Sequence, residues 1–113
     1  MEMTYHCRVE RADRVQNIID HIGLGQIVKE RYYRSIEEVT AGKPGHYICI
    51  TNTGITLVKT EDKRAVITMY VTTYRELVKV YDGANRIPTY LHKRVDRNQS
   101  HFIRNGKTTF KAR

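Results

Sequence analysis

The sequence has few of the residues that mark secreted or membrane proteins. It has no tryptophan and two cysteines, Cys7 and Cys49, which are too few for a disulfide framework and favour a reducing compartment. The N-terminus lacks the apolar run of a signal peptide. The longest stretch without acidic or basic Lys/Arg side chains, from Pro44 to Val58, is too short and too often broken by glycine, asparagine and threonine to span a bilayer. We therefore expect a cytoplasmic protein with no membrane partner.

Several enzyme signatures are also missing. Gly23-Leu-Gly25 lacks the third glycine and the Lys-Ser/Thr pair of a phosphate-binding loop, and there is no Gly-x-Ser-x-Gly nucleophile motif. The five histidines are scattered. His46 and Cys49 are spaced like metal ligands, but in a strand their side chains would point to opposite faces. We expect neither a metal site nor a cofactor.

The positive charge is concentrated at the C-terminus. Residues 1–91 hold 13 Lys/Arg against 11 Asp/Glu, whereas residues 92–113 hold seven against Asp96 alone. Such a concentration favours binding of a phosphate polyanion, and the alternative is a solvated tail that binds nothing. A chain of 113 residues that is 40% hydrophobic is expected to form one domain over 1–113, with 98–113 as a flexible or hairpin tail.

The middle of the chain predicts an antiparallel meander. Residues 46–51, 55–60 and 65–73 are rich in β-branched and aromatic residues and are separated by short polar connections. Two-residue alternation divides their side chains between two faces. The expected core face holds Ile48, Ile50, Ile55, Leu57, Ala65, Ile67, Met69 and Val71. The expected open face is rich in hydroxyls and holds Tyr47, Cys49, Thr51, Thr56, Thr60, Thr68, Tyr70 and Thr72.

Helices are expected on both sides of this meander. Asp13 is the predicted N-cap of the first, Ser35-x-x-Glu38 and Thr73-x-x-Glu76 are capping boxes, and Pro88 suits a first helical turn. Residues 4–9 read as a short strand, and residues 26–34 fit a helix or a strand imperfectly, with a helix favoured. The fold class is therefore α+β: N-terminal helices on one face of an antiparallel three- to four-stranded meander, followed by C-terminal helices.

The basic tail contains a hairpin signal. Asn105-Gly106 favours a two-residue turn, which would place Arg104 opposite Lys107 in a basic β-hairpin beginning near His101. Like charges facing each other are unfavourable unless an anion lies between them. The predicted nucleic-acid-binding residues are Lys59, Arg64, Lys93, Arg94, Arg97, Arg104, Lys107 and Lys111.

The hydroxyl-rich face has two interpretations. It is either an ordinary solvated sheet face or a surface for a phosphodiester, with tyrosines that stack on unpaired bases and a basic rim. Arg75 is the strongest candidate of this rim, because it lies in the first turn of a capped helix, where free amides attract anions. His46 is a candidate general acid or base, although a lone histidine at a strand end is more often a surface residue.

The order of elements resembles the barnase/EndoU/colicin/RelE-like ribonuclease superfamily, over residues 10–82, and also small phage and mobile-element proteins of that build. The resemblance rests on layout and on segments such as 46–58 (HYICITNTGITLV) and 64–71 (RAVITMYV). It implies a metal-independent RNA endonuclease in which the 2′-hydroxyl attacks the adjacent phosphate. The positions it implies are His46, Lys59, Arg64, Tyr70, Thr72 and Arg75, of which His46, Tyr70, Thr72 and Arg75 form the predicted catalytic set.

A second hypothesis is a non-enzymatic protein of the same phage or mobile-element type. It would bind nucleic acid, RNA rather than DNA, or an acidic antitoxin or host protein, through the basic tail of residues 92–113. The hypotheses differ in their tests, because an enzyme loses turnover when a catalytic residue is replaced, whereas a binding protein loses affinity with the tail.

Overall fold

The computed structural model describes the fold of residues 1–104 and the side chains of residues 1–101, and it is an α+β protein as the sequence predicts. The elements in chain order are the π-helical turn η1 (His6–Glu10), α1 (Ala12–His21), β1 (Ile27–Tyr33), α2 (Ile36–Thr40), β2 (His46–Thr51), β3 (Ile55–Thr60), β4 (Val66–Val71), α3 (Tyr74–Tyr81), the 3₁₀ turn η2 (Ala84–Arg86) and α4 (Thr89–Arg104).

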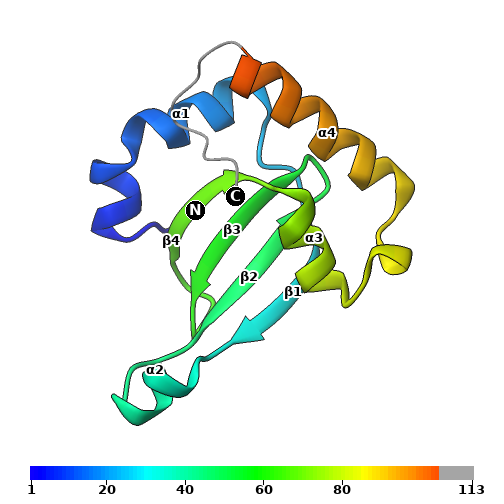
Figure 1. The fold of residues 1–113 in the computed structure, drawn as a ribbon. Helices are drawn as coiled ribbons and strands as arrows, with labels where there is room; N and C mark the ends of the chain where they lie inside the picture. Colours follow the sequence, from blue (N-terminus) through cyan, green and yellow to red (C-terminus); the bar gives the residue numbers. More distant parts are fainter. Residues whose placement is uncertain (105–113) are drawn as a thin grey trace.

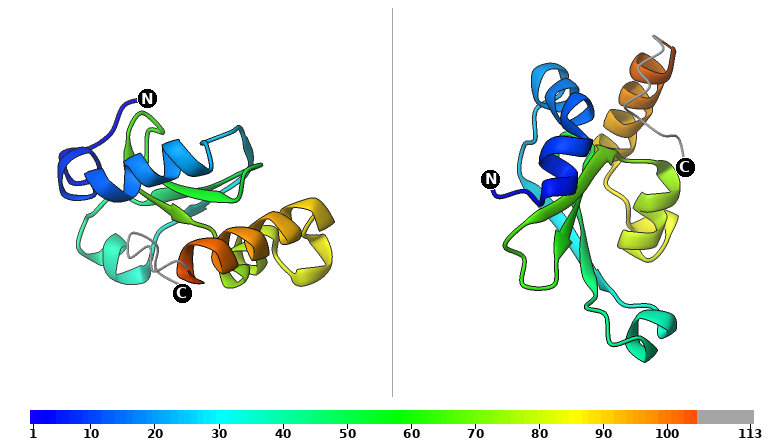
Figure 2. Two further views of the ribbon diagram at one scale, coloured as in Figure 1. Left: turned by 90° about the horizontal axis from the view of Figure 1, so that it is seen from above. Right: turned by 90° about the vertical axis from the view of Figure 1, so that its left-hand side faces the viewer.

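The strands form one antiparallel sheet in the order β1-β2-β3-β4, with helices on both faces (Figure 1). Figure 2 shows α1 on one side of the sheet and α3 and α4 on the other. On the first side, the α1 face, Val15 and Ile18 pack with Leu57 and Met69. On the second side, the α4 face, Leu77 and Leu91 pack with Ile48 and Ile50, the latter fully buried. The prediction of helices on one face is therefore correct for the N-terminal helices, and a second layer covers the other face.

The division of side chains between the two faces was predicted wrongly. Cys49 pairs with Leu57, and Leu57 with Met69, so these three point to the α1 face. Ile48 pairs with Val58 and points to the α4 face with Ile50. A register that differs by one residue moves a whole strand's side chains to the opposite face. The aliphatic side chains are thus shared between two cores.

A β-bulge changes the alternation again in β4. The register between β3 and β4 shifts between Val58 and Lys59, so that Lys59 lies opposite Val66. Val66 is therefore buried in the α1-face core, whereas Ile67, which was predicted to face the core, is partly exposed. A bulge places an extra residue in one strand and reverses the facing of those beyond it.

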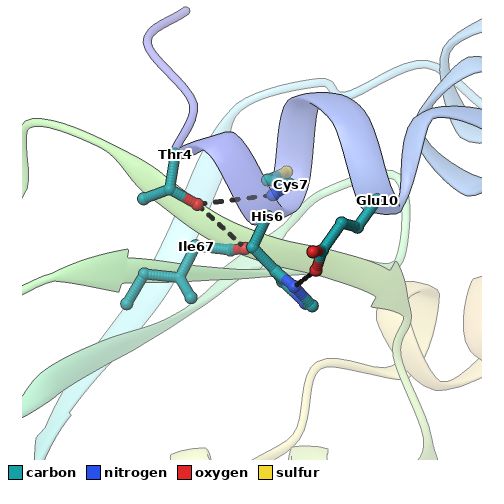
Figure 3. A network of polar contacts seen from close by, with 5 residues as sticks. All are labelled: Thr4, His6, Cys7, Glu10 and Ile67. Carbon is teal, nitrogen blue, oxygen red and sulfur yellow. Dashed lines mark hydrogen bonds and ion pairs between the residues drawn. The ribbon is translucent and has the colours of Figure 1, made fainter.

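Two predicted elements differ in type. Residues 27–33 form the edge strand β1 and not a helix, because their backbone pairs with β2 along its whole length. Residues 6–10 form η1 and not a strand (Figure 3). There the Thr4 hydroxyl donates to the Ile67 carbonyl at 3.5 Å and accepts from the Cys7 amide at 3.4 Å, which ties the turn to β4. Before this turn, Met3 forms a parallel β-bridge with Val66.

The helix signals were more reliable. Ser35 and Glu38 form the predicted capping box, with side chain-to-amide distances of 3.1 and 2.9 Å. At Thr73 half of the predicted box is present, because its hydroxyl accepts from the Glu76 amide while the Glu76 carboxylate binds Tyr70. The N-cap of α1 is Arg11 and not Asp13.

The C-terminal helix is longer than the sequence suggested. α4 follows Pro88 as predicted but continues through Arg104. Residues 101–104, assigned to the first strand of a basic hairpin, are helical, so this half of the prediction is wrong. The Asn105-Gly106 turn and Lys107 lie outside the described residues. Along the described part of the chain, no helix has the length and apolar character needed to cross a membrane.

Candidate functional site

The side chains predicted to form a hydroxyl-rich surface are divided between the two faces of the sheet: Cys49 lies in the α1-face core, whereas Thr56 and Tyr70 lie opposite one another with Ile50 on the α4 face. Tyr70 is 3% exposed, and its hydroxyl donates to Glu76 Oε1 at 2.6 Å. Thr72 is 0% exposed, and its hydroxyl hydrogen-bonds to that of Thr56 at 2.9 Å. Neither side chain can contact a polymer in this arrangement, so the expectation of an open sheet face is wrong and the catalytic roles of Tyr70 and Thr72 lose their structural basis.

The other two predicted catalytic residues lie apart. His46 begins β2 and is half-buried, with its ring stacked on Tyr33 at 6.3 Å between centroids. Arg75 is exposed in the first turn of α3, in a depression that Lys79 also lines. The structure therefore does not assemble the four predicted residues into one site.

Lys59 and Arg64 lie near the β3–β4 turn, at the end of the sheet that also carries α2. We call this the distal end (Figure 1). At this end, basic side chains either form ion pairs with acidic ones or have acidic residues next to them in the sequence. Lys63 forms an ion pair with Glu30, and the Asp62 carboxylate accepts from the Thr60 hydroxyl and the Arg64 amide. These contacts hold the pKa of Asp62 below its ordinary value.

The opposite end of the sheet, which we call the pocket end, carries a different arrangement. The C-terminal end of α1 and the second half of α4 lie on opposite sides of the sheet (Figure 2). A pocket of about 250 Å³ lies between them. Its lining is His21 and Ile22 from the end of α1 and Arg94, Arg97, Asn98 and His101 from α4. Predicted binding residues Arg94 and Arg97 are thus brought together with two histidines.

The β2–β3 turn holds the two walls of this pocket in place. Asn98 is 5% exposed and donates from Nδ2 to the Thr53 carbonyl at 2.9 Å. The Thr53 hydroxyl donates to the Gly23 carbonyl at 2.7 Å, just beyond the end of α1. Because buried polar groups that are fully bonded fix their neighbours firmly, this chain of contacts sets the separation of α1 and α4.

Gly54 allows α4 to approach the turn closely. Its φ is +85°, and a Cβ there would lie 2.8 Å from Asn98 Nδ2 and 3.2 Å from Arg94 Cγ. Both the backbone conformation and the contact exclude a larger residue. The sequence element Asn52-Thr-Gly54, predicted as a simple strand connection, therefore also contacts two of the pocket residues, Asn98 and Arg94.

The cations of α4 fall into two groups. Arg94, Arg97 and His101 face the pocket side. On the other flank, His92 lies 3.5 Å from Asp96 and packs edge-on against Tyr74. Among residues 1–101, neither Arg94 nor Arg97 forms an ion pair with a carboxylate. Lys93 is exposed on the outer side, the side chain of Arg104 lies outside the described set, and so does Lys111.

Three polar lining residues were not among the predicted site residues: His21, Asn98 and His101. Positions 94, 97, 98 and 101 have the i, i+3, i+4, i+7 spacing of one helical face. This signal was present but was hidden by assigning residues 98–113 to a tail. No sequence signal placed His21 opposite them, because that contact depends on how two distant helices cross the sheet.

The two thiols lie outside the pocket, in the α1-face core. Burial, followed by the nearby charge of Glu30, raises the pKa of the Cys49 thiol to about 11, so it stays protonated near neutrality. Among the described side chains, no three His, Cys, Asp or Glu residues are grouped in a way that could hold a metal ion.

The chemistry of the pocket is that of an anion site. Guanidinium groups bind phosphate oxygens through paired N–H donors, and histidine side chains donate hydrogen bonds and exchange protons near neutral pH. A comparison with protein-family models, curated proteins and solved structures found no match for this chain. The resemblance to ribonucleases in layout stays a prediction.

Proposed function

We propose that this protein binds RNA through the pocket end, with Arg94 and Arg97 as the principal phosphate-binding residues. The observation that carries the proposal is that two arginines and two histidines from two helices line a single pocket. Positive charge gathered in one concave place raises the local potential far more than the same charge spread over a surface. The preference for RNA over DNA rests on the layout resemblance alone.

The test is a salt titration of binding to a labelled single-stranded RNA, measured by fluorescence anisotropy. Each phosphate contact contributes about −0.7 to the slope of log K against log salt for a single strand. The double variant Arg94→Gln/Arg97→Gln removes two contacts, so we expect the slope to become shallower by about 1.4 and the affinity to fall about tenfold or more at low salt.

The matched control is Lys43→Gln/Arg86→Gln, which removes the same charge from exposed residues outside the pocket. We expect its affinity to stay within about twofold of the parent, because such distant exposed charges are largely screened. Equal losses in the two double variants would show that only net charge matters. A flat salt response of the parent would end the proposal, and equal affinity for single-stranded DNA would remove its RNA part.

Metal-independent RNA cleavage is a second candidate function, favoured by the presence of His21 and His101 in the same pocket. One histidine would take the proton of the 2′-hydroxyl as this attacks the phosphorus, and the other would protonate the departing 5′-oxygen. The arginines would stabilise the negative charge that develops on the phosphoryl oxygens. The roles predicted for His46, Tyr70, Thr72 and Arg75 are not part of this proposal.

Cleavage is tested by incubating labelled RNA with the protein in chelator and looking for fragments that end in a 2′,3′-cyclic phosphate. His21→Asn and His101→Asn should each lower the rate by about 10²-fold or more, with little change in RNA affinity. If the RNA stays intact over a broad pH range, the cleavage proposal is contradicted, while the RNA-binding proposal is unaffected. An acidic protein partner, also predicted from the charge, would lose affinity with the same arginine variants.

A further inference from the structure

The lining of the pocket includes one buried and firmly held side chain, that of Asn98. Asn98 is almost fully buried and bound to the β2–β3 turn, and Gly54 beneath it leaves no space between the turn and α4. Its volume of about 250 Å³ lies just below the range of ordinary small-molecule sites, which begins at about 300 Å³. A surface that follows a nucleic-acid strand serves several nucleotides in a row. A pocket of this small volume, with a buried side chain in its lining, is better suited to one terminal group.

The charges suit a group with more than one negative charge. An internal phosphodiester carries one charge and presents two non-bridging oxygens. A terminal phosphate monoester carries about −1.5 to −2 charges near neutral pH and presents three acceptor oxygens. Arg94 and Arg97 each offer a fork of N–H donors, and His21 approaches from the opposite helix. N–H donors from two sides can bind all three oxygens of a monoester, whereas the two non-bridging oxygens of a diester would leave some of these donors without an acceptor.

We propose that the pocket binds the terminal phosphate monoester of an RNA chain, so that the protein recognises a phosphorylated RNA end. This inference rests on the proposed RNA binding and adds a specific ligand to it.

The experiment compares one RNA sequence of about twelve nucleotides in three forms: hydroxyls at both ends, a 5′-phosphate, and a 3′-phosphate. We expect one phosphorylated form to bind about tenfold tighter than the form with two hydroxyls, because charge-assisted bonds to a dianion are the strong ones. Arg97→Gln should reduce this preference to about twofold, and Arg97→Glu should abolish it. Lys43→Gln, far from the pocket, should keep it. Thermal unfolding of each variant verifies that the fold is intact.

The outcomes separate the two proposals. Equal affinity for the three forms, with binding still lost in the arginine variants, would overturn end recognition and leave RNA binding in place. No binding of any form would remove both. Inorganic phosphate or a nucleoside monophosphate that binds as tightly as the phosphorylated RNA would show a small-molecule site instead. A phosphoserine peptide that binds as tightly as the RNA would replace RNA by a phosphoprotein as the ligand.

Discussion

The two ends of the sheet carry similar numbers of basic residues but organise them differently. Across residues 34–45 and 59–64, which lie at the distal end, five Lys/Arg are accompanied by four Asp/Glu. Across α4, at the pocket end, four Lys/Arg are accompanied by Asp96 alone. At the distal end, Lys63 forms an ion pair with Glu30, and the Asp62 carboxylate accepts from the Arg64 amide. At the pocket end, Arg94 and Arg97 line a concavity.

The difference shows that basic residues have to be judged by their neighbours. A cation whose charge is matched by a carboxylate on the same surface adds little to the attraction of a distant polyanion. Lys59 and Arg64, predicted as binding residues from their type, lie where charges are balanced. The better candidates for binding are basic residues that the fold brings together at one place without acidic neighbours, such as Arg94 and Arg97.

Removing a buried anchor of α4 should have the largest effect. Leu91 is 0% exposed in the α4-face core, whereas Ile36 on α2 is 79% exposed. We expect Leu91→Ala to lower the free energy of unfolding by about 2–5 kcal/mol, because it leaves a cavity. Ile36→Ala should change it by less than about 0.5 kcal/mol. Urea denaturation measures both, and similar losses would contradict the difference in burial between Leu91 and Ile36.

Alanine substitutions at two glycines with positive φ, one at each end of the sheet, allow a direct comparison of the two ends. Gly42 at the distal end has φ +72°, and a Cβ there would have no other atom within 4 Å, whereas a Cβ at Gly54 would clash with α4. Alanine at either position should cost about 1–2 kcal/mol through the left-handed backbone. At Gly54 the clash with Asn98 should add about 1–3 kcal/mol and lower RNA affinity. Equal losses in urea denaturation, with unchanged binding of Gly54→Ala, would show that the turn does not support the pocket.

Two threonine hydroxyls allow a finer comparison. The Thr53 hydroxyl donates to the Gly23 carbonyl between segments distant in sequence, whereas the exposed Thr40 hydroxyl donates within its own helix to Ile36 at 2.6 Å. Thr53→Val should cost about 1 kcal/mol, since a partly buried carbonyl loses its partner, while Thr40→Val should be close to neutral. Thermal unfolding measures both. Amide hydrogen exchange should increase at the end of α1 in Thr53→Val alone.

The smallest expected effect is the pH dependence of stability that arises from the Cys49 thiol. This thiol lies near the Glu30–Lys63 ion pair. Its pKa is raised to about 11 in the folded protein against an ordinary 9.0. Between these values the unfolded chain binds fewer protons than the folded one, so this thiol's contribution to stability is complete below pH 9 and falls as pH rises toward 11. Iodoacetamide at pH 8 should therefore modify Cys49 only after denaturation. Rapid modification of the folded protein would contradict the described burial.

Local signals predicted the fold better than they predicted the site. The Ser35-Glu38 box, the Pro88 helix start and the three central strands depend on neighbouring residues, and all are present. β1 was missed because its strand conformation comes from pairing with β2 rather than from its own alternation. The side-chain faces were misassigned because register is decided by turn geometry and a bulge.

The candidate site depended on longer-range information. Arg94 and Arg97 were identified from their type and charge context, whereas Asn98 and His101 required the true length of α4. His21 required the crossing of α1 over the sheet, for which the sequence contains no local signal. The burial of Tyr70 and Thr72 could not be predicted from the sequence either, because a strand that alternates hydroxyl and apolar side chains can present its hydroxyls to solvent or to another layer of the protein.

The hydrogen bonds at the β2–β3 turn have a consequence for folding. Thr53 contacts Gly23 and Asn98, which are 30 and 45 positions away in the chain. The pocket therefore forms only when the beginning, middle and end of the domain have assembled. A ligand that selects this pocket binds the complete fold and stabilises it by RT ln(1 + [L]/Kd), about 2.7 kcal/mol at a hundredfold excess over Kd. Occupancy of the pocket would thus slow amide exchange in three remote segments together.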